Sequence, residues 1–169
     1  MKRFSFTALL VMLVSLAYAA DLTNARWYTI KVANGGYLST KSGYMDGLNL
    51  LLNNTTEDTS DNGLWTFIGN ETDGYTFYNK ARGGSYVLGM SGSEANGRAK
   101  MVAESSTTIV TKFDMGKNGE GFWIKDHGST SKYWNKRGNY LAYWDNAAGS
   151  TDTGSRFIFT ICSIYPNCI

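Results

Sequence analysis

The chain has 169 residues, with 16 Lys and Arg against 14 Asp and Glu, and a sequence pI of about 8.5. Two of the basic residues, Lys2 and Arg3, precede an apolar run at the N-terminus, and without them the two charge types balance at 14 each. Nucleic acids and anionic membranes are normally recognised through a basic face. We therefore expect no nucleic-acid partner and no insertion into a membrane.

The N-terminus has the pattern of a secretory signal peptide. After Lys2 and Arg3, residues 4–16 are almost wholly apolar, and Ala17 and Ala19 place small side chains where a signal peptidase reads them. The apolar run is also shorter than the roughly 20 residues that a spanning helix needs. The sequence predicts a signal peptide over residues 1–19 and a secreted protein, extracellular or periplasmic, with one domain over residues 20–169.

The remaining length of about 150 residues is enough for a single domain with its own core. Nineteen glycines, one proline and frequent Asn, Asp, Ser and Thr indicate many turns between short strands, so the predicted class is all-β. An aromatic-x-apolar triplet begins at Tyr28 and recurs at Tyr75 and Phe122, each 47 residues after the last. Equal spacing of this kind indicates three internal repeats, over about 27–74, 75–121 and 122–169.

Each repeat contains four predicted strands. In chain order they cover residues 28–30, 36–38, 48–52 and 64–67, then 75–77, 85–87, 99–103 and 112–115, then 122–124, 132–134, 140–144 and 156–159. One such unit cannot bury its own apolar face, whereas three units around a pseudo-threefold axis can close a barrel without a long exposed edge. This predicts a β-trefoil with Trp27, Trp65 and Trp123 in its core. A sandwich of about twelve strands is the alternative architecture.

The pattern from Leu48 to Phe67 resembles the ricin B-type β-trefoil lectins, whose repeats carry Gln-x-Trp in the fourth strand. Trp65 keeps the signature tryptophan, and Phe113 and Phe157 replace it in the other repeats. The signature glutamine is replaced at all three positions, by Gly63, Thr111 and Ser155. The resemblance implies a divergent, non-catalytic, carbohydrate-binding trefoil whose partners are glycans or glycoconjugates.

The resemblance also implies where a sugar would bind. Such a pocket uses an Asp after the second strand, an aromatic residue on the third strand and a nearby amide. The first two repeats lack this set, apart from the amide of Asn62. The implied carbohydrate-binding residues are Asn135, Tyr143, Trp144, Asp145 and Asn146 of the third repeat, together with Asn62. Because neighbours on a strand point to opposite faces, we expect either Tyr143 or Trp144 to lie in the core.

No residue pattern indicates catalysis. His127, the single histidine, follows Asp126, but adjacent strand residues point to opposite faces, whereas a catalytic triad or metal site needs converging side chains. We expect no catalytic residue, no metal and no cofactor. Two other functions stay open: a trefoil that binds a protein, such as a secreted protease inhibitor, and a small hydrolase.

Cys162 and Cys168 are the two cysteines of the chain, and Pro166 and Asn167 can turn the chain between them. In an exported protein this arrangement predicts a disulfide bond that pins the C-terminal tail.

Overall fold

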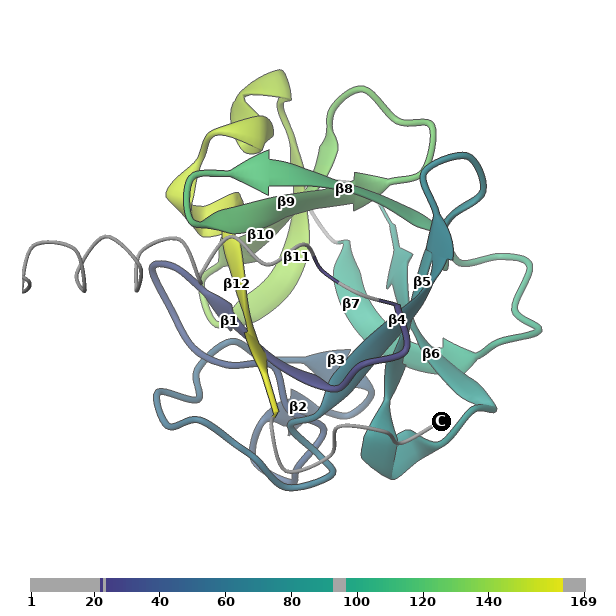
Figure 1. The fold of residues 1–169 in the computed structure, drawn as a ribbon, viewed down its shortest axis with the longest axis vertical. Coiled ribbons are helices and arrows are strands. Elements are labelled where there is room, and N and C mark those ends of the chain that lie inside the picture. Colours follow the sequence, from purple (N-terminus) through teal and green to yellow (C-terminus); the bar gives the residue numbers. More distant parts are fainter. Residues whose placement is uncertain (1–21, 23, 93–96, 163–169) are drawn as a thin grey trace, which may run out of the picture.

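The computed structural model describes residues 22, 24–92 and 97–162 (Figure 1). In this part of the chain twelve strands form one continuous sheet, joined by turns and short 3-10 helices, which confirms the all-β prediction. The predicted signal peptide lies outside the described residues, as does Cys168. Across the described residues, no helix is both long enough and apolar enough to span a bilayer.

The sheet closes on itself as a barrel. Neighbouring strands of the ring are antiparallel, and β12 pairs with β1 to complete it. The ring strands in chain order are β1 (Tyr28–Val32), β4 (Trp65–Asn70), β5 (Gly74–Asn79), β8 (Phe113–Asn118), β9 (Gly121–Asp126) and β12 (Phe157–Ile161). A wider closed path of nine strands leaves this ring at β5 and returns at β9 through two hairpins. Closure leaves the ring strands without an unpaired edge.

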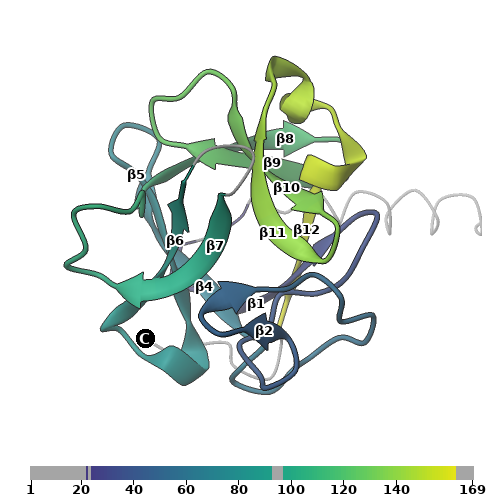
Figure 2. The same cartoon turned by 180° about the vertical axis from the view of Figure 1, so that it is seen from behind.

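The other described strands form three hairpins on one side of the ring. They are β2 (Met45–Asp46) with β3 (Asn49–Leu50), β6 (Tyr86–Ser91) with β7 (Arg98–Ala103), and β10 (Lys132–Arg137) with β11 (Tyr140–Asp145). The view from behind shows these hairpins grouped around the centre of the molecule (Figure 2). Pairings of β3 with β7 and of β7 with β11 join them. Each sequence repeat thus supplies two ring strands and one hairpin.

The three aromatic residues spaced 47 apart occupy corresponding places in the ring. Each pairs across to the aromatic residue at the fourth-strand signature position, in β4, β8 or β12. The three pairs are Tyr28 with Trp65, Tyr75 with Phe113, and Phe122 with Phe157. The internal repetition of the sequence is therefore also a repetition of strand register.

The first repeat differs from its predicted four strands. Instead of a strand over residues 36–38, Tyr37 makes isolated bridges to Lys31 and Asn54. The Gly36 N–H donates to the Leu52 carbonyl oxygen at 3.0 Å, and a Cβ atom at Gly36 would lie only 2.6 Å from that oxygen, so the close approach of the two segments requires glycine here. The two-residue strand β2, which begins at Met45, pairs with β3 in its place.

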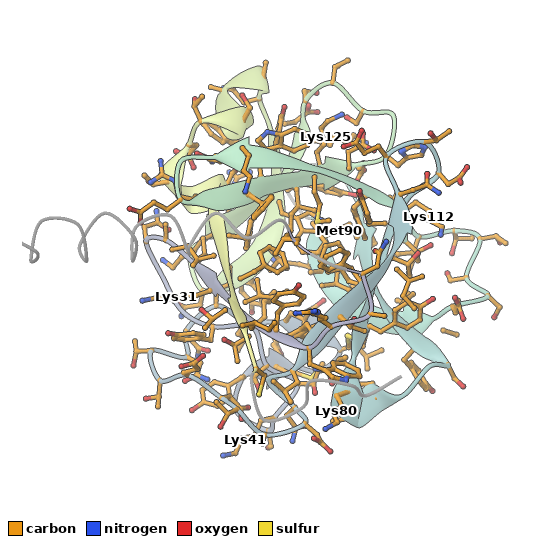
Figure 3. The ribbon with its side chains drawn as sticks, in the orientation of Figure 1. Lys31, Lys41, Lys80, Met90, Lys112 and Lys125 are labelled. Atoms are coloured by element: carbon orange, nitrogen blue, oxygen red, sulfur yellow. The ribbon has the colours of Figure 1, made fainter. Side chains whose placement is uncertain are left out.

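The core is rich in aromatic side chains that lie inside the ring and beneath the hairpins. The largest fully buried ones include Trp65, Trp134, Phe113 and Phe157. The ring centroids of Phe113 and Trp134 are 4.8 Å apart in an edge-to-face arrangement, a favourable geometry for aromatic pairs. Figure 3 shows Met90 near the centre of the molecule and the labelled lysines at its periphery.

Two of the three tryptophans predicted for the core lie nearer the surface. Trp65 is fully buried, but Trp27 and Trp123 are only partly buried. Trp27 precedes the first residue of β1, and Trp123 lies on the outward side of β9, whose inward residue Ile124 is fully buried. The prediction was wrong for Trp27 because β1 begins one residue later, and for Trp123 because an aromatic residue on a strand does not by itself reveal which face it occupies.

Cys162 is buried at the end of β12, and its backbone N–H donates to the Trp27 carbonyl oxygen at 2.9 Å. Its predicted partner Cys168 falls outside the described residues. The disulfide bond stays a prediction.

Candidate functional site

The β10–β11 hairpin carries most of the predicted site residues. Its register places Tyr133 opposite Trp144 and Trp134 opposite Tyr143. Successive residues of a strand point to opposite faces, and Trp134 and Tyr143 are the pair that enters the core, with 0% and 1% of their surface exposed. Trp144 therefore lies on the outer face of the hairpin, where it is partly exposed.

In the core, Tyr143 forms hydrogen bonds with a buried carboxylate. Its hydroxyl group lies 2.5 and 2.6 Å from the two carboxylate oxygens of Asp126 on β9. The ring is enclosed and the hydroxyl is engaged, so Tyr143 does not present an aromatic face to a ligand. Of the two neighbouring aromatic residues, Trp144 is the one available for stacking.

Asp145 and Asn146 lie beside Trp144 and are exposed. The loop between β9 and β10 holds both: the Ser131 hydroxyl donates to the Asp145 carboxylate, and the Asn146 backbone N–H donates to the Ser131 carbonyl oxygen at 3.0 Å. Asn146 Oδ1 also accepts from the Ala148 N–H at 2.9 Å, capping the short helix η3 (Ala147–Ser150). A carboxylate and an amide, both held by neighbouring residues, thus follow the partly exposed indole directly in the chain.

Asn135 is buried and does not belong to the exposed group formed by Trp144, Asp145 and Asn146. Its Nδ2 donates to Asp152 Oδ2 at 2.9 Å and to Ser155 Oγ at 2.8 Å, and only 8% of the residue is exposed. The helix η4 (Thr153–Ser155) covers it, with Gly154 packed against the amide. The amide therefore fastens the β11–β12 connection to the hairpin.

Asn62 lies in the first repeat, in the turn before β4. The Thr40 backbone N–H donates to the Asn62 carbonyl oxygen at 2.9 Å, and the Thr40 hydroxyl lies 3.2 Å from Asn62 Oδ1 and 2.9 Å from Asn79 Oδ1. Asn79 Nδ2 donates to the same carbonyl oxygen at 2.8 Å. These bonds organise the turn, and none of them joins Asn62 to the described residues of the third repeat.

A second outward aromatic residue, missed by the sequence prediction, lies near Tyr133. The ring centroids of Trp123 and Tyr133 are 5.7 Å apart, edge to face. Gly116 lies directly across from Trp123 in the β8–β9 hairpin, and a Cβ atom there would lie 2.1 Å from the indole. Gly149 of η3 similarly leaves space for the Tyr133 ring, because a Cβ atom at Gly149 would lie 2.4 Å from the ring. A glycine opposite an aromatic residue was the available sequence signal.

Asp114 on β8 is the centre of a polar cluster on the outside of the barrel. Its carboxylate bonds to Lys125 Nζ at 2.9 Å, to His127 Nδ1 at 2.6 Å and to the Gly128 N–H at 3.2 Å. Burial opposes ionisation, but the hydrogen bonds from His127 and Lys125 outweigh it and lower the pKa of Asp114. Asp126 points inward while His127 points to this cluster, so the two neighbours do not form a catalytic pair.

Metal ligands do not converge in the part of the chain that the structure describes: it contains no group of three or more His, Cys, Asp or Glu side chains placed to hold an ion.

Comparison with known proteins gives a likeness of fold. No family model matches the sequence, and no curated protein matches it. Among solved structures, Cry35Ab1 is similar with a TM-score of 0.63 and 19% identity, over 88% of this chain and 39% of that chain. A GlcNAcα1-4Gal-releasing endo-β-galactosidase from Clostridium perfringens is similar with a TM-score of 0.62 and 11% identity, over 82% and 33%. The chain spans about two fifths or less of either protein's length.

Proposed function

We propose that this protein is a secreted, non-catalytic carbohydrate-binding β-trefoil whose ligand site is centred on Trp144 in the third repeat. The equivalent pairs Tyr28 with Trp65, Tyr75 with Phe113, and Phe122 with Phe157 support a threefold arrangement. The resemblance to the ricin B-type lectins supports the same architecture.

The observation that carries the proposal is the partly exposed indole of Trp144 on the outer face of the β10–β11 hairpin, followed directly in the chain by the exposed residues Asp145 and Asn146. A partly exposed indole offers apolar area to the C–H face of a pyranose, and a carboxylate and an amide supply acceptors and donors for its hydroxyl groups. Each neutral hydrogen bond contributes about 1 kcal/mol. A shallow site of this kind binds one sugar with a Kd in the high-micromolar to millimolar range, roughly −4 to −5 kcal/mol.

The two similar structures are compatible with this proposal. One of them is, by its name, an enzyme that acts on a galactoside, and the likeness covers 33% of its chain. A domain that makes up a third of an enzyme can bind a ligand while another part of the enzyme performs catalysis. For the present chain, we propose binding without catalysis because Asp126 and His127 diverge and no other pairing of a nucleophile with a base stands out in the sequence.

A glycan array followed by calorimetric titration tests the proposal. Binding of the best glycan should weaken about tenfold or more in Trp144→Ala and persist in Trp144→Phe, which keeps an aromatic face. Tyr86→Ala is the matched control, because Tyr86 is an exposed aromatic residue, 48% accessible, on the second repeat. Absence of binding to every glycan, or equal affinity for wild type and Trp144→Ala, would overturn the proposal. Inhibition of a protease in a panel assay without glycan binding would instead favour the protein-binding alternative.

A further inference from the structure

The carboxylate of Asp126 is buried at the end of β9, with 5% of the residue exposed. Both of its oxygens lie within hydrogen-bonding distance of the Tyr143 hydroxyl, at 2.5 and 2.6 Å. A tyrosine hydroxyl has a single proton to donate. One proton therefore serves two buried acceptor oxygens.

This contact joins two strands that are not neighbours. β10 lies between β9 and β11, pairing with the first at Tyr133 and Lys125 and with the second along its whole length. The bond from Tyr143 to Asp126 passes on the core side of β10 and connects the far strand of the hairpin directly to the barrel. Any change in this bond acts on the strand that also carries Trp144.

We propose that Asp126 and Tyr143 form a proton-sensitive latch that holds the β10–β11 hairpin against β9 and tightens when the Asp126 carboxyl group takes up a proton. In the protonated form the carboxyl group has a proton of its own to donate. The two hydroxyl protons, one on Asp126 and one on Tyr143, are then shared among the three oxygen atoms of the pair. In the ionised form the buried negative charge has, among the described residues, a single neutral donor at hydrogen-bonding distance. The latch is a property of the fold and does not depend on the proposed carbohydrate ligand.

The electrostatic surroundings agree with this geometry. Burial raises the pKa of Asp126 to about 6, against the opposing influence of the Tyr143 hydrogen bond and of Lys132 and Lys125. Burial and the Asp126 charge together raise the pKa of Tyr143, so its hydroxyl keeps its proton.

The charged groups on the strands around the latch are already engaged or exposed. On β9, Lys125 is bound to Asp114 of β8, which also binds His127. Lys132 on β10 is exposed, with Nζ 5.8 Å from the centroid of the Tyr143 ring, and Asp145 on β11 is bound by Ser131. Among the described residues, none of these charged groups forms a hydrogen bond with the Asp126 carboxylate.

The sign of the effect follows from linkage. A folded-state pKa above the unfolded value means that the native protein binds the proton more tightly, so the stabilisation is present in acid and is lost as the pH rises through about 6. With the ordinary aspartate pKa of about 3.9 for the open form, the opening constant of the hairpin should rise about tenfold between pH 5 and pH 7.5.

Hydrogen-exchange protection factors of the β10–β11 amides, measured on the intact protein at pH 5 and pH 7.5 and corrected for intrinsic exchange, test this. Amides of the β4–β5 hairpin are the internal reference. The wild type should lose about tenfold protection in β10–β11 at the higher pH. Asp126→Asn, which cannot ionise, should show no such loss, and Tyr143→Phe should show a larger one because the carboxylate has then lost its donor.

Carbon-13 NMR titration of the Asp126 carboxyl group in the wild type decides the matter even where a variant fails to fold. A midpoint near 6 supports the latch. A midpoint below about 4.5, or equal β10–β11 protection at the two pH values, would overturn it. Neither result bears on glycan binding, which the Trp144→Ala titration tests separately.

Discussion

The indole N–H of Trp65 donates to the Leu38 carbonyl oxygen at 3.1 Å, in a fully buried position. This bond connects β4 of the barrel to the segment of the first repeat that makes only isolated bridges. Trp65 is also the single residue that retains the signature tryptophan. Its side chain therefore combines core volume with a hydrogen bond that orders the least regular repeat.

Trp65→Phe should lower the free energy of unfolding by about 2–4 kcal/mol, because it leaves the Leu38 carbonyl oxygen buried without a donor and removes part of the indole volume. Urea denaturation monitored by circular dichroism measures the change. Tyr86→Phe, at an exposed position, is the control and should alter stability by less than about 0.5 kcal/mol. A loss below about 1 kcal/mol for Trp65→Phe would contradict the structural role given to the bond.

Gly149→Ala should destabilise the protein by about 1–3 kcal/mol, because the new Cβ would lie 2.4 Å from Cγ of Tyr133 and force η3 away from the hairpin. Gly84→Ala is the matched control, since a Cβ atom there meets no other heavy atom within 4 Å. Thermal unfolding compares the two. Similar melting temperatures for both variants would show that η3 does not pack on Tyr133.

Ser39→Ala should cost about 1 kcal/mol at neutral pH, because the buried Ser39 hydroxyl donates to Asp58 Oδ2 at 2.6 Å. Burial of Asp58 opposes ionisation, but hydrogen bonds from Ser39 and Ser60 and the charge of Lys41 outweigh it, so the pKa of Asp58 is lowered. A lowered folded-state pKa stabilises the protein above the ordinary aspartate pKa, and the stabilisation is lost as the pH falls through the lowered value.

The cost of Ser39→Ala should therefore shrink in acid. Urea denaturation of wild type and variant at pH 7 and pH 3 measures it, and a larger cost at pH 3 than at pH 7 would refute the assignment.

The opposite sign holds at Asp126, so wild-type stability should be greatest in mildly acidic solution. From about pH 4 to pH 6 the contribution of Asp126 falls, by up to about 3 kcal/mol for a shift of two pKa units, while Asp58 and Asp114 lose their contributions only in stronger acid. Melting temperatures recorded from pH 3 to pH 8 test this. A profile that keeps rising from pH 5 to pH 8 would contradict it.

Mass spectrometry after alkylation of the protein, expressed with its predicted signal peptide and purified, should find no reactive thiol at Cys162 or Cys168 until a reductant is added. The loop that the two cysteines would close is short, so in the chain-entropy model reduction should cost less than the roughly 3 kcal/mol of a 15-residue loop. Alkylation of both cysteines without reductant would show that the predicted disulfide is absent. The same sample reports the N-terminal residue, which should be Ala20.

The sequence predicted the all-β class and the repeated register because both follow from regular spacing. The triplets at Tyr28, Tyr75 and Phe122 are 47 residues apart, and alternation within each strand shows that one face is apolar. It did not predict β2, since Met45 and Asp46 have no strand pattern of their own and form a strand only through their pairing with β3.

The candidate site was less predictable, because it depends on which face of a strand another segment covers. Alternation required either Tyr143 or Trp144 to enter the core, but the choice was settled by Asp126, 17 residues away in the sequence. Asn135 looked available because the helix that covers it, η4, consists of three small residues with no pattern of their own. The local sequence shows which side chains a strand carries, whereas tertiary packing decides which of them another segment covers.

The pairing of β1 with β12 has a consequence for how the protein is made. Strand β1 lacks one of its two neighbours until β12 has been synthesised. The barrel therefore cannot close before translation of the third repeat is complete. Pairing of strands that are far apart in the sequence also carries a loop-closure cost that slows folding. The nascent protein therefore passes through a stage in which the first two repeats expose apolar surface that the third repeat later covers.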